Sequence, residues 1–158
     1  MIVARKVLSS CRFKGMHLIQ RMVAERPVRP ASAQVRLVVE RALFLKRRWR
    51  GVAEDGTEFG FDLESRLSNG CVIFQTEAAE YVIWQAPELV YEMEAGSADF
   101  AALAGWKIGN LHLPVQIVDG FIRITHDPAV RQLLEREGWP FEEVTAVFNP
   151  LRVTPHAS

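Results

Sequence analysis

The sequence predicts an α+β protein in which a small all-β domain is followed by a ferredoxin-like domain with the element order βαββαβ. Hydrophobic and polar residues alternate over short stretches of residues 35–87, with turn-forming residues between them, which is typical of β-strands. Strand-like and helix-like patterns alternate in residues 88–150. Asp119-Gly120, in this second part, favours a two-residue hairpin turn because both of its positions need a positive φ. We expect two domains, with residues 1–34 as an extension and residues 151–158 as a short tail.

The composition is that of an ordinary folded cytoplasmic protein. Of the 158 residues, 49% are hydrophobic and 24% are charged, which is enough apolar material to bury a core. The 19 basic and 19 acidic residues cancel, so no overall field attracts nucleic acid or an anionic membrane, and we expect neither as a partner. No apolar run approaches the ~20 residues that span a bilayer. Cys11 and Cys71 form no CxxC pair, so we interpret both as free thiols in a reducing compartment.

Residues 1–34 differ from the rest of the chain. Only basic charges precede the first acidic residue, Glu25, and the breaker-rich run from Arg26 to Pro30 follows. A basic, acid-poor start also fits a transit peptide, but a secretory signal needs a longer apolar core and a small-residue cleavage site. We expect a loose extension, and we assign no role to His17, which lies within it.

Short strands separated by polar turns are predicted throughout residues 35–87. They are Leu37–Glu40, Trp49–Ala53, Glu58–Leu63, Cys71–Gln75 and Tyr81–Gln85. Lys46–Arg50 is a basic run with one aromatic residue, a feature that nucleic-acid-binding proteins use. The same run fits a solvated edge strand with Trp49 turned inward, because basic side chains also protect exposed sheet edges. We favour the edge strand.

Strands and helices alternate beyond Pro87. The first helix has Ser97 as its N-cap and Gly109 as its stop, and the second begins at Asp127-Pro128 and ends at Gly138. The residues expected on the buried stripes are Phe100, Leu103, Ala104 and Ile108 in the first helix and Val130, Leu133 and Leu134 in the second. The strands are Leu89–Met93, the two arms of the hairpin around Asp119-Gly120, and one between Phe141 and Phe148.

The turn at Asp119-Gly120 sets the register of the hairpin. If pairing continues without interruption, His112 lies opposite Asp127. His112 and His126 then lie at the same open end of the hairpin but on opposite faces of the sheet. One chain is not expected to chelate a metal with this pair alone, so a second chain or a mobile segment must contribute.

Three histidines are candidate metal ligands: His112, His126 and His156. Imidazole binds nickel, zinc and copper well, and the usual affinity order places copper above nickel, so these ligands do not select the metal. Each histidine also has a simpler interpretation. His112 fits a hydrogen-bonded, partly buried side chain, His126 a neutral side chain beside a helix start, and His156 a tail without fixed structure.

Two segments closely resemble the motifs GNxHxPxQI and RxxHD of the UreE family of urease accessory metallochaperones. They are Gly109–Ile117, which reads GNLHLPVQI, and Arg123–Asp127, which reads RITHD. The resemblance extends more weakly through Glu54–Phe61 and covers Val35 to Pro150. It implies a β-rich domain that resembles the peptide-binding domain of Hsp40 chaperones and binds partners, followed by a ferredoxin-like metal-binding domain. It also implies a homodimer that delivers Ni(II) to the urease apoprotein and its accessory GTPase complex.

The same resemblance implies roles for single residues. His112 matches the histidine that meets its twin from the other subunit and holds one metal ion at the dimer interface. His126 matches the first histidine of the HDH variant of the family, but Pro128 stands where the second would be, and Lys107 replaces a histidine found in some members. The histidine-rich tail of the family is missing. His156 alone occupies a position similar to the tail histidine that completes the interfacial site in some relatives.

No catalytic pattern stands out in the sequence. It has no GxxxxGK(S/T) phosphate loop, and no serine or threonine has a histidine and an acid in a hydrolase pattern. We therefore expect a metal carrier without catalysis. One alternative is a ferredoxin-like RNA-binding module that uses Lys46–Arg50, although the paired aromatics of the RRM motif are missing. Another is a small acylphosphatase-like hydrolase, but no phosphate-cradling loop with an arginine precedes the first helix.

Overall fold

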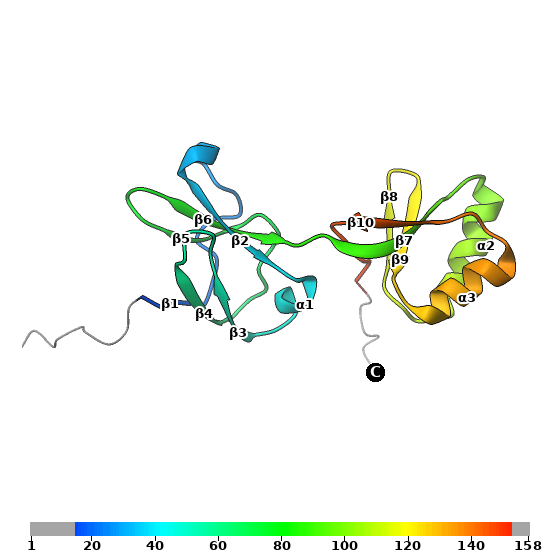
Figure 1. Ribbon diagram of the computed structural model, residues 1–158, viewed down its shortest axis with the longest axis horizontal. Helices are drawn as coiled ribbons and strands as arrows, with labels where there is room; N and C mark the ends of the chain where they lie inside the picture. The colour runs from blue at the N-terminus through cyan, green and yellow to red at the C-terminus, as the bar shows by residue number, and fades with distance from the viewer. Residues whose placement is uncertain (1–14, 153–158) are drawn as a thin grey trace, which may run out of the picture. The chain divides into compact units, whose positions relative to one another are not determined.

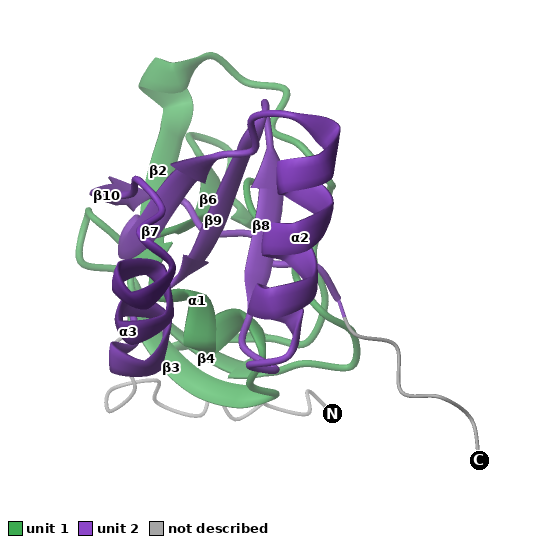
Figure 2. Ribbon diagram, turned by 90° about the vertical axis from the view of Figure 1, so that its right-hand side faces the viewer, with its two compact units in different colours: residues 1–85 green, residues 86–158 purple. Residues whose placement is uncertain are grey.

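The computed structural model describes residues 15–152 in two compact units. Unit 1 comprises residues 1–85 and unit 2 residues 86–158 (Figure 2). Short strands dominate unit 1, whereas two helices accompany a four-stranded sheet in unit 2 (Figure 1). The predicted α+β class is therefore confirmed. Within the described part of the chain, no helix is long and apolar enough to cross a membrane.

Unit 1 contains two three-stranded sheets, with the strand orders β1-β4-β3 and β2-β6-β5. The strands are β1 (His17–Ile19), β2 (Gln34–Val39), β3 (Arg48–Val52), β4 (Glu58–Asp62), β5 (Val72–Gln75) and β6 (Glu80–Gln85). All five predicted strands occur, and β2 begins at Gln34 rather than Leu37. The unit also contains a 3-10 turn at Ala31–Ala33 and a one-turn helix, α1 (Arg41–Phe44), which the sequence pattern did not indicate.

One hydrophobic core joins the two sheets of unit 1. Leu37 and Ile83 come from one sheet and Phe59 and Phe61 from the other, and all four are at most 3% exposed. Burial of such side chains contributes about 1.5–3 kcal/mol each. Trp49 stacks on Phe61 with ring centroids 3.7 Å apart, so this aromatic is turned inward.

The expectation of a loose extension is wrong for the part of it that the structure describes. β1 pairs in parallel with β4, and Ile19 on β1 is 4% exposed within the core. His17, to which the sequence analysis assigned no role, stacks on Phe74 with ring centroids 4.3 Å apart. His17–Ile19 therefore form an integral strand of the sheet, and Figure 1 shows this strand, β1, beside β4.

The chain between β1 and β2 also forms hydrogen bonds with residues far away in the sequence. The backbone N–H of Ala24 donates to the carbonyl oxygen of Val72, and the N–H of Val72 donates to the carbonyl oxygen of Ala24. Farther along, the fully buried carboxylate of Glu80 accepts the backbone N–H groups of Val28 and Arg29, each at 3.0 Å. A buried carboxylate needs such donors because water does not reach it. The periodicity of residues 1–34 could not reveal these bonds, because the partners lie in β5 and β6.

Unit 2 is a four-stranded antiparallel sheet with the order β10-β7-β9-β8, and both helices cover one of its faces (Figures 1 and 2). Its elements are β7 (Glu88–Glu94), α2 (Ala98–Gly109), β8 (Val115–Val118), β9 (Phe121–Thr125), α3 (Pro128–Glu137) and β10 (Glu142–Ala146). The helix signals act as predicted with one exception, the end of α2. Ser97 Oγ accepts the N–H of Phe100 at 3.2 Å, Asp127 Oδ1 caps α3, and Gly138 ends α3 in the left-handed conformation.

The core of unit 2 lies between the sheet and the helices. Its buried members are Tyr91, Met93, Ile122 and Ile124 from the sheet, Ala104 and Ile108 from α2, and Val130, Leu133 and Leu134 from α3. Leu103, which the pattern assigned to the buried stripe of α2, is instead 46% exposed. The opposite face of the sheet carries an ion pair between Arg123 Nε and Glu92 Oε2 at 2.6 Å.

Candidate metal centre

The hairpin of β8 and β9 orients the candidate site. Asp119 and Gly120 have φ values of 50° and 80°, as the predicted turn requires, and Ile117 lies opposite Ile122. Pairing ends at Val115, so the expected pairing of His112 with Asp127 is wrong. Pro114 has no N–H to continue the ladder, and the chain before it turns back toward α2. His112 therefore lies outside the ladder, and the expected placement of the two histidines on opposite faces of it is wrong.

His112 lies in the turn that follows α2. The helix ends at Gly109, as predicted, but Gly109 is its last helical residue and not a left-handed cap, and Asn110 still has φ −66°. The left-handed residue is His112, with φ 54°, and its N–H donates to the carbonyl oxygen of Gly109 at 3.1 Å. Non-glycine residues rarely adopt this conformation, although histidine does so more often than most.

The side chain of His112 is exposed, whereas those of Leu111 and Leu113 pack against the core of unit 2. The two leucines hold the turn in place, so the imidazole between them has a fixed backbone and an open surface. Neither ring nitrogen has a hydrogen-bond partner among residues 15–152. Either nitrogen can therefore bind a metal ion without first breaking a bond to the described chain.

His126 has a different environment. Its ring stacks on the buried Tyr91 at 4.6 Å, and its Nε2 lies 3.4 Å from Glu143 Oε1. Arg131 also binds this oxygen, at 3.0 Å. The hydrogen bond to Glu135, followed by the charge of that carboxylate, raises the pKa of Arg131, so the arginine stays charged. His126 can coordinate a metal through Nε2 only if it shares or gives up Glu143.

The described chain does not bring a complete ligand set together. Residues 15–152 contain no group of three or more His, Cys, Asp or Glu side chains that could hold a metal ion. His156 lies outside the described residues. Lys107 Nζ donates to Glu137 Oε2 at 2.7 Å. In the described part of unit 2, the candidate ligands are thus the imidazole of His112, which has no hydrogen-bond partner there, and the histidine–carboxylate pair of His126 and Glu143.

Two features near His112 were missed by sequence reasoning. The first is an exposed stripe on α2 that contains Leu103 and Trp106, 46% and 66% exposed, beside Gly105 and Gly109. A Cβ added to either glycine would meet no atom within 4 Å, so nothing in the described chain requires a glycine there. The signal was available, since glycine inside a helix is unfavourable by about 1 kcal/mol relative to alanine.

The second missed feature is the chain after β10. Phe148 is fully buried, and Leu151 donates its backbone N–H to the carbonyl oxygen of Val115 at 2.7 Å. Gln116 Oε1 accepts the backbone N–H of Asn149 at 3.2 Å. The segment therefore lies along β8, and β8 is the strand that follows His112 closely in the sequence. No periodic pattern could have indicated this contact.

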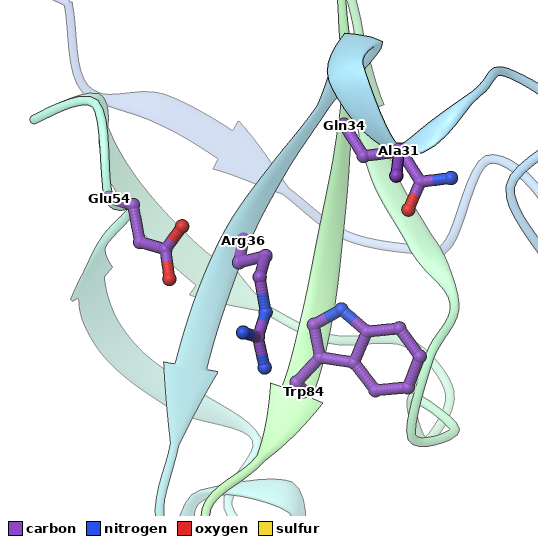
Figure 3. Close-up of a pocket in the computed structure, with 5 residues that line it drawn as sticks. All are labelled: Ala31, Gln34, Arg36, Glu54 and Trp84. Atoms are coloured by element: carbon purple, nitrogen blue, oxygen red, sulfur yellow. The ribbon is translucent and has the colours of Figure 1, made fainter.

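Unit 1 contributes a hollow of about 450 Å³ that is lined by Ala31, Gln34, Arg36, Glu54 and Trp84 (Figure 3). It is open to solvent and combines an indole ring with groups of both charges. The basic run lies elsewhere in the unit. Arg47 Nε and Arg48 Nε each lie 3.1 Å from the same oxygen of Asp62. The hydrogen bond from Arg48 is the largest cause of a lowered pKa of Asp62, and the charges of both arginines add to it. With Trp49 inward and these arginines paired, the run offers no aromatic ring to a nucleobase.

Comparison with known proteins gives a consistent result. A family model described as the C-terminal domain of the UreE urease accessory protein matches residues 88–157. A urease accessory protein UreE from Pseudomonas putida is 30% identical over 138 residues, which cover 85% of this chain and 81% of that protein. Proteins of the same name from Chelativorans sp. (strain BNC1) and Bacillus cereus are 33% and 29% identical, over 66% and 77% of this chain and 68% and 82% of their own lengths. The chain therefore belongs to the UreE family of urease accessory proteins.

Proposed function

We propose that this protein is a nickel-binding metallochaperone that delivers Ni(II) for assembly of the urease active site and holds the ion at a homodimer interface. The observation that carries the proposal is the exposed imidazole of His112, held by a left-handed turn within GNLHLP and without a hydrogen-bond partner in residues 15–152. One imidazole cannot hold a transition-metal ion tightly. Two copies of His112, related by a two-fold axis, provide two matched nitrogen ligands.

The exposed stripe of α2 supports dimerisation. Leu103 and Trp106 expose apolar surface, and Gly105 and Gly109 leave the helix backbone accessible between them. A second helix can approach such a surface closely, in the same way that small residues admit close packing of helices elsewhere. His112 lies three residues after the last residue of α2, so contact between two α2 stripes is expected to bring the two imidazoles toward the same axis.

His126 and His156 are proposed as outer or alternating ligands of this ion. Leu151 is anchored on Val115, and the five residues from there to His156 can extend by about 17 Å. The contact between His126 Nε2 and Glu143 opposes metal coordination, because the ring nitrogen must leave or share the carboxylate in order to bind the ion. Both are therefore expected to add to the affinity that His112 establishes. Zinc and copper compete for the same nitrogen ligands, and nickel is proposed on the basis of the family.

We propose that unit 2 binds the metal ion and that unit 1 binds partner proteins. The order β7-α2-β8-β9-α3-β10 with the sheet order β10-β7-β9-β8 supports a ferredoxin-like fold for unit 2, the metal-binding part. Unit 1 is proposed to bind the urease apoprotein and its accessory GTPase complex, with the hollow beside Trp84 as the candidate contact. The protein is proposed to act in the cytoplasm, without catalysis and without binding nucleic acid.

The test is nickel stoichiometry measured together with mass. Equilibrium dialysis of the full chain should return about one tightly bound nickel ion per two chains, and light scattering should return the mass of a dimer. Because the 158 residues contain four histidines in all, few ions should bind tightly. Three or more tight nickel ions per dimer, or a monomer that binds nickel equally tightly, would contradict the proposal.

A further inference from the structure

β3 forms an open edge of its sheet in unit 1. In the order β1-β4-β3, no strand of the described chain pairs with the far side of β3 (Figure 1). The N–H of Ala53 donates to the carbonyl oxygen of Thr57, and the N–H of Leu63 donates to that of Arg47. The odd-numbered residues of this antiparallel pair therefore direct their backbone groups toward β4. The even-numbered residues direct theirs away from it, and these residues are Arg48, Arg50 and Val52.

The outward backbone groups of β3 have no hydrogen-bond partner in the part of the chain that the structure describes. Just beyond the strand, the N–H of Glu54 donates to the carbonyl oxygen of Arg36 at 2.9 Å, so the edge is closed there. The open stretch is therefore Arg48–Val52, which we call the β3 edge. Such an edge offers donors and acceptors in the spacing that another extended chain needs.

The β3 edge is positively charged. Residues 46–52 contain four basic residues and no acidic one. Arg47 and Arg48 share the carboxylate of Asp62, whereas Lys46 and Arg50 are exposed and have no ion-pair partner among residues 15–152. The one carboxylate that contacts the run is thus already shared by two arginines, and the positive charge of the edge is left largely uncompensated.

This charge decides which kind of chain can pair with the β3 edge. A second copy of the same edge would place arginines opposite arginines, and like charges in directly opposed positions destabilise a sheet. A nucleic acid offers phosphates to the basic side chains but cannot continue a backbone ladder, and Trp49 stacks inward on Phe61 instead of facing a base. An extended peptide with acidic side chains satisfies both the backbone groups and the charges.

We propose that the β3 edge binds an extended acidic segment of a partner protein as an added strand. The side chains of Arg48 and Arg50 lie on the same face of the sheet, because they are two residues apart on one strand. The bound segment should therefore carry acidic residues at every second position, opposite these arginines. Its other side chains lie on the face of Trp49, where apolar residues fit. This interaction does not depend on nickel and is separate from the hollow beside Trp84.

Substitutions of Arg50 separate the charge from the backbone. Arg50→Lys keeps the charge, Arg50→Thr removes it and keeps a strand-forming residue, and Arg50→Pro also removes the N–H. Because this N–H faces away from β4, proline breaks no bond of the existing ladder. Arg50→Glu reverses the charge, and Arg26→Glu, at an exposed position outside the strands, is its matched control. Circular dichroism establishes that each variant is folded before it is titrated.

The probe is an acetylated peptide of alternating glutamate and valine, titrated into the metal-free full chain. Amide hydrogen exchange followed by NMR should slow at Arg48 and Arg50 when the peptide is added. Arg50→Lys should bind as the wild type does. Arg50→Thr should raise the Kd about threefold, and Arg50→Pro should raise it about fivefold more, which corresponds to one further hydrogen bond. Arg50→Glu should weaken binding more than Arg50→Thr, and Arg26→Glu should leave the Kd unchanged.

Two further peptides and one oligonucleotide make the outcome decisive. A peptide with lysine in place of glutamate should not bind, and a glutamate peptide with methylated backbone nitrogens should bind much more weakly, because it cannot donate to the ladder. Equal binding of either peptide would overturn the added strand. So would oligouridine that protects the amides of Arg48 and Arg50 while the glutamate peptide does not. Because the chain is free of metal in this experiment, its result is independent of the nickel titration.

Discussion

Thr125 bonds twice to the carbonyl oxygen of Pro114, through its backbone N–H at 3.4 Å and its hydroxyl at 3.3 Å. Thr125 directly precedes His126, and Pro114 follows closely after His112. The contact ties the two arms of the hairpin together beyond the last paired residues, Val115 and Ile124. The two histidines therefore flank the same hydrogen-bonded end of the hairpin, although one lies in a turn and the other stacks against the core.

His112 should be the essential ligand. His112→Asn is the sharpest variant, because asparagine tolerates the positive φ of this position and lacks the imidazole. One substitution removes two ligands from a shared ion, so calorimetry should detect no tight nickel binding. Light scattering should still detect a dimer, since apolar contacts on α2 are proposed to hold it. A variant that binds nickel as tightly as the wild type would remove the basis of the proposed function.

His126 should make a smaller contribution. His126→Ala should raise the nickel Kd about tenfold, or 1.4 kcal/mol, and only together with His156→Ala should the loss approach that of His112→Asn. Glu143→Gln is the informative partner. This variant removes the carboxylate charge that faces His126 Nε2, so nickel binding should become tighter if His126 coordinates through that atom. If neither change alters the titration, His126 is not a ligand.

The glycines of α2 should matter for the dimer rather than for the single chain. Gly105→Leu should stabilise the helix of an isolated chain by roughly 0.7–1 kcal/mol, because a Cβ there meets no atom within 4 Å. In a dimer that packs two α2 stripes, the same leucine keeps the helices apart. Sedimentation should therefore show monomers. Gln132→Leu, at an exposed position of α3, is the matched control and should leave the dimer intact.

Unit 2 should fold alone. It has its own buried core, and the chain divides between residues 85 and 86. A fragment of residues 86–158 should have a cooperative thermal transition by circular dichroism and should bind nickel with the stoichiometry of the full chain. An unfolded fragment, or a folded one without nickel binding, would show that unit 1 is required.

Tyr81 should make unit 1 acid-sensitive. Its hydroxyl donates to Asp55 Oδ2 at 2.6 Å. Burial raises the pKa of Asp55, but hydrogen bonds from Tyr81 and Thr57 outweigh this and lower it below its usual 3.8. The stabilisation is therefore present above pH 3.8 and is lost as the pH falls through the folded pKa. Tyr81→Phe should lower the free energy of unfolding by about 1 kcal/mol near pH 7.

Urea denaturation followed by tryptophan fluorescence at pH 3 to 7 checks the Tyr81 prediction. The wild type should lose stability at the acid end, and the difference between wild type and variant should shrink there. A difference that is the same at every pH would mean that the hydroxyl stabilises unit 1 without acting through Asp55.

Signals that act within a few residues were readable from the sequence. Asp119-Gly120 formed the predicted turn because positive φ is a property of those residues, and Asp127-Pro128 and Gly138 bounded α3 because caps and stops are local. The motif GNLHLPVQI was likewise sufficient to indicate the UreE family. The end of α2 is the exception, since Gly109 is helical and His112 takes the left-handed position.

Only the tertiary structure decided which distant segments meet. β1 joins β4, Glu80 binds the chain at Val28, and Asn149 binds Gln116, all through hydrogen bonds between residues far apart in sequence. Such bonds depend on which edges and buried groups the folded chain leaves unsatisfied, and no local pattern records that. For the same reason the sequence indicated His112 and His126 as candidate ligands but could not show that the ring of His112 is exposed and that the ring of His126 contacts Glu143.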